Sequence, residues 1–437
     1  MSMFHVKHIM NKIRQYKLSE ILLFIFILIM PWQTRILFNS ETSYTEWYFN
    51  YHQAIFLYLT DLVFLVIIGS LLVEHVKLRF KSIFVTIFIT LCALGLFHVQ
   101  RHDLGIYNLF KWTQIVSLII IIPSILTTRP KLYIAVFVLF ISGAMQALIA
   151  IIQFHVQHMV GLRFMGEYIS SIGTAGLSTI DVANEKIIRA YGTMPHPNVL
   201  GGYLLTTLSS GLILVSRATK YKLYFFFGII LTLLGIFLSF SRSAWIAGLF
   251  ILVSYETYLL FKKNYKLFFV SCATLIVSCA TITILYQPYV VSRATNVSNS
   301  TAVTDRQLLN EKSLEIFYIN PWQGTGVGNY VSQMQNTFHM EPWQYQPPHN
   351  IFLFILAELG ILGFLSFVLM IAHIVGKSFN KTFLWWMCGT TIFAILLIGT
   401  LDHYFVTIQQ GRLMLGLMLG LTLATKNIKN DSHETIH

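Results

Sequence analysis

The sequence predicts an all-α polytopic membrane protein with about twelve transmembrane helices and two longer extracytoplasmic loops. The 437-residue chain is 55% hydrophobic and only 11% charged, whereas a soluble chain carries about 25% charged residues. Continuous apolar runs of about 18 residues or more, long enough to cross a bilayer, recur along the whole chain. The Lys- and Arg-rich loops between these runs also fall on one side. We therefore expect one integral membrane domain over residues 1–437.

Twelve apolar runs give the expected spans. In chain order these are 18–38, 54–73, 82–98, 109–126, 132–154, 198–215, 223–240, 243–261, 267–286, 350–372, 382–400 and 406–424. If they alternate across the bilayer, every short basic loop lies on the same face, which the positive-inside rule makes cytoplasmic. The sequence thus predicts a multi-pass protein of the cytoplasmic membrane with both termini in the cytoplasm. The first run follows basic residues without a small-residue cleavage site and is typical of a signal anchor.

The net charge of +12 is explained by these orienting loops, so we expect no nucleic-acid partner. Four cysteines, Cys92, Cys272, Cys279 and Cys388, all fall inside apolar runs. They lack the spacing of a disulfide framework or a metal site and are expected to be small core residues. The sequence predicts no cofactor and no metal.

The two longer loops, residues 155–197 and 287–349, are expected on the opposite, extracytoplasmic face. ATP is absent there, and the glycine run Gly324–Gly328 (GTGVG) lacks the Lys-Ser/Thr that follows in a P-loop. We interpret this run as a turn. A group transfer at this face needs a donor that carries its own activation, such as a polyprenyl-diphosphate sugar. We expect the 287–349 loop to roof the site.

Arg306 lies in this loop, in the sequence Thr304-Asp305-Arg306-Gln307. This has the form of a capping box and predicts a helix from Thr304 to about Ile319. Arg306 would then occupy the first turn, where free N–H groups, the helix dipole and the guanidinium all favour an anion. The alternative is a surface arginine paired with Asp305 or Glu311.

Arg242 lies in a very short turn, FSRSAW, between two apolar runs. A cation there is held at the outer membrane surface, where it opposes the charge bias of the chain. It is either an anion-binding residue or a snorkelling anchor of a span end.

His349 follows two prolines and precedes Asn350, which is suited to cap the next span. An imidazole at a helix N-terminus is pushed toward its neutral form, which a general base requires. His349 is therefore a candidate catalytic base, with an ordinary loop histidine as the alternative. Other candidate histidines are His155, His158, His196 and His403.

Three further residues are candidates for supporting roles. Glu358 is an ionisable group inside an expected span, and such groups face protein or water. Arg189 lies in the last part of the 155–197 loop. This loop leads into the sixth span, which Asn198 can cap. Arg412 and the pair Asp402-His403 flank the last outer turn, where they can complete the mouth of a cavity.

Five segments together resemble the bacterial O-antigen ligase and polymerase superfamily. They are GTMPHPNVLGGYL, FSRSAWIAG, TDRQLLNEKSLEIFYINPWQGTGVGNY, PPHNIFLFILAELGILGF and LDHYFVTIQQGRLMLGLMLGL, and they run from Gly192 to about Leu421. The resemblance implies a GT-C-like, metal-independent, inverting glycosyltransferase that takes glycan from undecaprenyl diphosphate at the outer membrane face. By motif position, Arg242 and Arg306 would hold the diphosphate and His349 would activate the acceptor hydroxyl.

The resemblance leaves the acceptor open. A polymerase of capsule, exopolysaccharide or O-antigen-like chains is the first expectation, with a flippase and a chain-length regulator of the same pathway as partners beside membrane lipids. A ligase that transfers a finished glycan to a lipid or protein is the alternative. The Arg-x10-Gly spacing of polymerases is missed by one residue at Arg189 and Gly201. A polysaccharide or lipid transporter is a further alternative, although no symmetry between two halves supports it.

Overall fold

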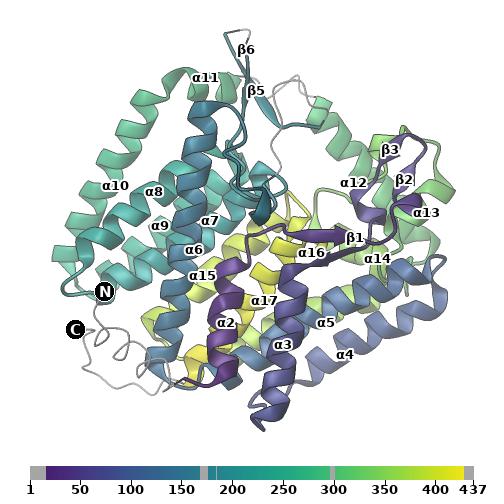
Figure 1. Ribbon diagram of the computed structural model, residues 1–437, viewed down its shortest axis with the longest axis horizontal. Coiled ribbons are helices and arrows are strands. Elements are labelled where there is room, and N and C mark those ends of the chain that lie inside the picture. The colour runs from purple at the N-terminus through teal and green to yellow at the C-terminus, as the bar shows by residue number, and fades with distance from the viewer. Residues whose placement is uncertain (1–15, 168–175, 184, 296–300, 428–437) are drawn as a thin grey trace.

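The computed structural model describes residues 16–167, 176–183, 185–295 and 301–427, and these form a helical bundle with a small cap (Figure 1). Each of the twelve expected spans falls on a helix. These are α2 (Leu18–Ile29), α3 (Leu59–Val73), α4 (Ile83–Leu94), α5 (His102–Ile125), α6 (Arg129–Val156), α7 (Pro197–Arg217), α8 (Lys222–Leu238), α9 (Arg242–Phe261), α10 (Tyr265–Leu285), α14 (Ile351–Ser378), α15 (Phe383–Gly399) and α17 (Gln409–Ala424).

Within the described ranges, α5, α6, α7, α9, α10 and α14 are each long and apolar enough to cross a membrane by themselves. Shorter apolar helices, among them α2, α3, α8 and α15, supply further candidates. The prediction of an all-α, multi-pass membrane protein is thus confirmed.

Helix α17 forms the centre of the bundle. All its residues are buried, and it packs against α5, α7, α14 and α15. Helix α10 lies at the periphery, with few buried side chains (Figure 1). A helix that is apolar all round and buried among others needs no lipid contact. The central position of α17 fixes the place of the segment before it, Asp402 to Ile408, which includes the short helix α16 (Tyr404–Thr407).

Short elements between the helices build the cap. They comprise three two-stranded antiparallel pairs: β1 (Arg35–Leu37) with β4 (Phe56–Tyr58), β2 (Tyr44–Thr45) with β3 (Tyr48–Phe49), and β5 (Thr179–Val182) with β6 (Glu185–Ile188). Helices α11 (Gln287–Thr295), α12 (Thr301–Ile319) and α13 (Tyr330–Thr337) belong to the 287–349 loop. Strand β5 contacts α11, so the two predicted loops meet.

Helix α14 is broken at Gly360, where φ is 66° and ψ is −174°. The turn from Pro321 to Gly326 fills the break: the N–H groups of Thr325 and Gly326 donate to the carbonyls of Ala357 and Glu358, at 3.1 and 2.9 Å. The N–H of Ile361 donates to Pro321 O at 2.9 Å. The glycine run is therefore a turn, as predicted, and it supplies partners for backbone groups that the helix leaves unpaired.

Candidate functional site

A histidine and a carboxylate from opposite ends of the 350–400 helical hairpin meet above the bundle. His349 Nδ1 lies 3.5 Å from Asp402 Oδ1. Nδ1 is buried and makes no hydrogen bond of its own, whereas the imidazole as a whole is 23% exposed and Asp402 is 7% exposed. Asn350 caps α14 through bonds from the N–H groups of Phe352 and Leu353, as predicted. His349 is therefore fixed directly before the N-terminus of α14, with one edge of its ring against the buried carboxylate of Asp402.

Asp402 is held by a chain of hydrogen bonds that reaches the 155–197 loop. Asn198 Nδ2 donates to Asp402 Oδ2 at 2.8 Å, and Arg189 Nη2 donates to Asn198 Oδ1 at 2.8 Å. Arg189 is buried, and its Nε donates to Ser239 O at 2.8 Å. Asn198 does not cap α7, contrary to expectation: His196 is the cap, because its Nδ1 accepts from the N–H of Asn198. Arg189 thus positions the network rather than offering its own fork to a ligand.

The pKa values around Asp402 follow from these contacts. Burial alone would raise the pKa of Asp402, but the neighbouring His349, His403 and Asn198 outweigh it and hold the pKa well below its usual range. Burial lowers the pKa of His403 to about 3, and the nearby His349 adds to this effect. The carboxylate is therefore charged and His403 is neutral across the physiological range.

Three histidine rings, those of His349, His403 and His52, form a row that begins beside Asp402. The His349 and His403 rings lie 5.2 Å apart between centroids, and the His403 and His52 rings lie 5.5 Å apart. Burial lowers the pKa of His52, and His403, Arg412 and His349 contribute in that order. His52 lies in a short helical turn, Tyr51–Gln53, in a loop whose residues were not singled out from the sequence.

Three arginines, Arg242, Arg293 and Arg306, lie near one another. Burial lowers the pKa of Arg293, and the charges of Arg242 and Arg306 lower it further, so these three guanidinium groups lie close together. All three are half-buried, and none forms an ion pair with a carboxylate among the described residues. Arg293 Nε donates to Phe240 O at 3.2 Å, in the short turn that precedes Arg242. Like charges held together without counter-ions favour a multivalent anion.

The position predicted for Arg306 within its helix is wrong. Helix α12 begins at Thr301, so Thr304 is inside the helix and Arg306 occupies its second turn. A capping-box pattern marks a preferred start, and here the helix continues through it. The predicted end is confirmed, because α12 stops at Ile319 before Asn320-Pro321. Arg306 acts on an anion through its own charge, with little help from the helix terminus.

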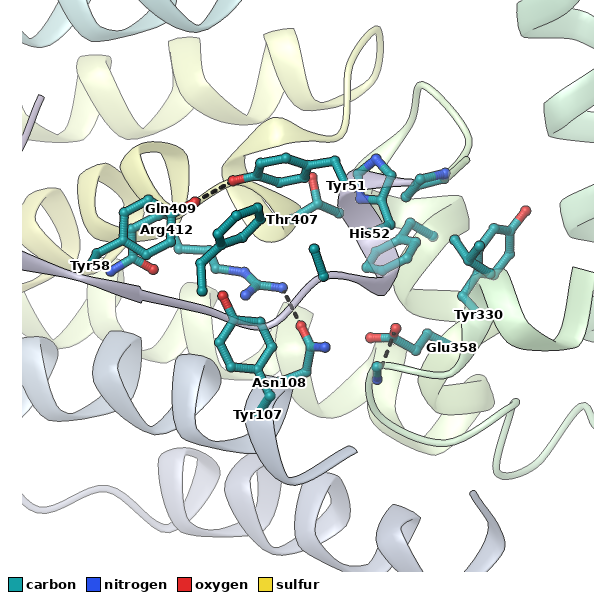
Figure 2. A pocket seen from close by; sticks show the side chains of 16 residues that line it. Tyr51, His52, Tyr58, Tyr107, Asn108, Tyr330, Glu358, Thr407, Gln409 and Arg412 are labelled. Atoms are coloured by element: carbon teal, nitrogen blue, oxygen red, sulfur yellow. Dashed lines mark hydrogen bonds between the residues drawn. The ribbon is translucent and has the colours of Figure 1, made fainter. Parts of the chain in front are cut away.

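Glu358 and Arg412 line a polar pocket that His52 also lines (Figure 2). Glu358 Oε1 accepts from the N–H of Gly328 at 3.0 Å, and Arg412 Nη2 donates to Asn108 Oδ1 at 2.7 Å. The cavity volume of ≈ 40 Å³ has room for about three water molecules. Tyrosines line much of this pocket (Tyr51, Tyr58, Tyr107 and Tyr330). These two candidates therefore share a pocket with His52 and are not part of the group formed by Arg242, Arg293 and Arg306.

His349, Asp402 and His403 also have the composition of a metal site, since their ligating atoms all lie within 4.8 Å of one another. Two imidazoles and one carboxylate suit a divalent transition metal. At His403 the charge of Asp402 favours a cation, and the weaker influence of Arg306 opposes one. The same arrangement fits a carboxylate–imidazole pair that moves a proton.

The sequence analysis did not identify Arg293 as a candidate. It placed Asp402 at the mouth of a cavity and did not predict its pairing with His349. Arg293 lies in the longest loop, in the sequence VVSRATN, and nothing in its spacing points to an anion. Asp402 follows a span directly, and a carboxylate at such an end is a signal for a buried partner.

Comparison with known proteins bears on this arrangement. Residues 227–368 match the O-antigen ligase family model, a stretch that contains Arg242, Arg293, Arg306 and His349. The resemblance to the O-antigen ligase superfamily is confirmed. The chain is also similar to a general O-oligosaccharyltransferase of Acinetobacter baylyi (strain ATCC 33305 / BD413 / ADP1), with 25% identity over 254 residues. The match covers 54% of this chain and 44% of that protein, so the chain spans under half the length of the relative it matches.

Residues 227–368 include the helix that begins at Arg242 and the start of the helix that follows His349. Asp402 and Arg412 lie beyond the matched residues. The partner of His349 in the candidate site therefore comes from outside the matched stretch.

Proposed function

We propose that this protein transfers a glycan from a polyprenyl-diphosphate carrier to an acceptor hydroxyl at the outer face of the cytoplasmic membrane. The observation that carries the proposal is the pairing of His349 with buried Asp402, in a structure that also brings together three arginines without an ion-pair partner among the described residues. A base beside a multivalent anion site is what transfer from a diphosphate requires. The family match and the oligosaccharyltransferase relative support the same class of reaction.

The steps use this chain's own residues. His349 Nε2 takes the proton of the acceptor hydroxyl while that oxygen attacks the anomeric carbon of the donor sugar. The bond from this carbon to the diphosphate oxygen breaks, and the polyprenyl diphosphate leaves with the electron pair. Arg242, Arg293 and Arg306 take up the charge that grows on it. Asp402 holds Nδ1–H of the ring and stabilises the imidazolium that forms. Direct displacement inverts the anomeric centre, and no metal enters.

Among the acceptors, transfer of a finished glycan to a lipid or protein fits the comparisons better than chain polymerisation does. The family model is that of O-antigen ligases, and the relative is named an oligosaccharyltransferase. The first expectation, a polymerase, receives no specific support. A flippase would still be needed to deliver the donor to the outer face. Both termini of the chain lie in the cytoplasm in this proposal.

The test uses purified full-length protein in nanodiscs with a polyprenyl-diphosphate oligosaccharide and no nucleotide. Lipid, protein and second-donor acceptors are supplied separately, and products are separated on gels. We expect one transfer event per acceptor molecule and a loss of about 10²–10⁴ in rate for His349→Ala. His339→Ala is the matched control, because His339 is an exposed histidine in the same loop.

A ladder of products formed from the donor alone would instead support chain polymerisation. Movement of donor across the bilayer without any glycosidic product would overturn the proposal in favour of a transporter.

A further inference from the structure

Two exposed tryptophans from distant parts of the chain pack against each other. Trp47, in the turn between β2 and β3, is 67% exposed, and Trp343, in the helical turn Pro342–Gln344, is 46% exposed. Their ring centroids lie 6.0 Å apart, with 51° between the planes. Tyr48, itself exposed, packs edge-on to Trp47 at 6.0 Å. This group, Trp47, Tyr48 and Trp343, is called the aromatic platform below.

The platform is fixed in place before any ligand arrives. Asn50 Nδ2 donates to Tyr345 O at 2.7 Å, and Gln335 Nε2 donates to Thr45 Oγ1 at 2.6 Å. These bonds tie the β2–β3 hairpin to the segment that leads into His349. Preorganised aromatic rings lose little conformational entropy when a ligand covers them.

Each tryptophan has an exposed carboxylate as its neighbour in sequence. Glu46 precedes Trp47, and Glu341 lies two residues before Trp343. The backbone carbonyl of Glu341 accepts from the N–H of Gln344 at 2.8 Å, and neither carboxylate forms an ion pair with a described residue. Aromatic faces attract the polarised C–H groups of a sugar ring, while carboxylates accept hydrogen bonds from its hydroxyls. An anionic membrane surface repels the same carboxylates.

The platform is connected to His349 through two histidines and through the chain itself. His52 follows the β2–β3 hairpin, and its ring centroid lies 5.5 Å from that of His403, which lies 5.2 Å from that of His349. Trp343 precedes His349 in the same segment. An acceptor held on the platform is therefore bound to the two segments that lead to His349.

We propose that Trp47, Tyr48 and Trp343, with Glu46 and Glu341, bind sugar rings of an acceptor glycan and present its hydroxyl to His349. The carboxylates favour neutral or amino sugars over acidic ones. This inference rests on the proposed glycan transfer for the acceptor role, whereas sugar binding itself requires no turnover.

The chain supplies a matched control in Trp322. It stands in the same tripeptide, Pro-Trp-Gln, as Trp343 and is 67% exposed. Its backbone packs on the break at Gly360, and its ring stacks on no other ring of the part of the chain described. Trp322 fits the membrane-interface belt.

The first experiment measures binding of soluble tetrasaccharides of glucose, of N-acetylglucosamine and of an acidic uronate to the protein in nanodiscs without donor. We expect Trp47→Ala and Trp343→Ala to weaken binding of the neutral or N-acetylated probe at least tenfold, and Trp322→Ala to leave it unchanged. The acidic probe should bind more weakly than the neutral ones. Equal binding by all variants would overturn the platform, even if glycan transfer is established.

Two further measurements separate the remaining explanations. In turnover assays, the platform variants should raise the acceptor KM at least tenfold, with the donor KM unchanged; a raised donor KM instead would overturn the acceptor assignment. Brominated lipids in the nanodiscs should quench the fluorescence of Trp322 but not that of Trp47 or Trp343. The fluorescence of each tryptophan is obtained as the difference between the protein and the variant in which that tryptophan is replaced by phenylalanine. Quenching of the platform tryptophans would show a membrane contact and overturn the proposal.

Discussion

His349 Nδ1 faces Asp402 Oδ1 at 3.5 Å, across the gap between the start of α14 and the end of α15. The pair joins a partly exposed imidazole to a carboxylate that is buried and charged. This geometry holds the ring in one orientation and leaves its second nitrogen for a substrate.

Asp402→Asn tests this pairing. The amide keeps the volume and the bond with Asn198 but cannot stabilise an imidazolium, so we expect kcat to fall by about 10²–10⁴. The donor KM should stay within about twofold, because the arginines are untouched. Steady-state kinetics in nanodiscs give both numbers, and an unchanged kcat would show that Asp402 serves the fold alone.

Arg293→Ala tests the residue that sequence reasoning missed. Loss of one charge-assisted contact to phosphate costs about 1.5–3 kcal/mol, which is about a 10- to 100-fold weaker interaction with the diphosphate. Arg293→Lys should recover part of the affinity, since it keeps the charge without the planar fork. Binding of undecaprenyl diphosphate measures the effect, with Arg163→Ala, an exposed arginine of the other loop, as control. Equal losses in both variants would contradict a specific role.

Stability should fall as the pH is lowered from about 6.5, because the pKa of His403 is lowered to about 3 in the fold and is about 6.5 in an unfolded chain. Between these values only the unfolded state binds the proton, so the free energy of unfolding rises with pH, by about 1.4 kcal/mol per unit. Burial and Arg189 act on His196 in the same direction, lowering its pKa to about 3. Melting temperatures of the protein and of His403→Gln between pH 5 and 7.5 check this. The variant should show the shallower slope; equal slopes would assign the titration elsewhere.

Gly360→Ala should destabilise the protein. An alanine Cβ would lie 2.4 Å from the carbonyl carbon of Trp322, at a φ of +66°, which few residues other than glycine adopt. We expect a loss of at least about 1–3 kcal/mol and a lower melting temperature. Gly376→Ala is the control, since it lies in the same helix with nothing within 4 Å of the added Cβ. If both variants melt alike, the contact between the break and the turn is not tight.

Chelation separates the two interpretations of the His349, Asp402 and His403 cluster. We expect glycan transfer to survive dialysis against EDTA, since the proposed steps route nothing through a metal. Added Zn²⁺ should inhibit by competing for His349. Loss of activity on chelation with recovery on adding one divalent metal would replace the acid–base mechanism with a metal-assisted one.

The helices could be located from the sequence because each is an apolar run bounded by polar residues. Each of the twelve expected runs contains a helix, but the runs 18–38 and 54–73 also include strands β1 and β4. Local signals also gave the cap at Asn350 and the end of α12 at Asn320-Pro321. The start of α12 could not be fixed, since the residues before Thr304 are equally compatible with a helix.

The site itself was predicted only in part. Arg242, Arg306 and His349 carry local patterns, but their neighbours do not. Asp402 reaches His349, and Arg293 reaches Arg242, only through the packing of distant segments. Arg189, a candidate for a supporting role in the sequence, donates hydrogen bonds to Ser239 and Asn198, and no spacing in the sequence reveals these partners.

The break in α14 has a consequence for how such chains can be recombined. The carbonyls of Ala357 and Glu358 find their partners in the loop before the helix, and in hydrocarbon an unpaired carbonyl is costly. If the loop alone is moved into a relative with an unbroken helix, its backbone N–H groups lose the carbonyls that accept from them. The broken helix α14 that stays behind then keeps two carbonyls without donors. The exchangeable part is therefore the loop together with α14, and chimaeras cut between them should fail to assemble.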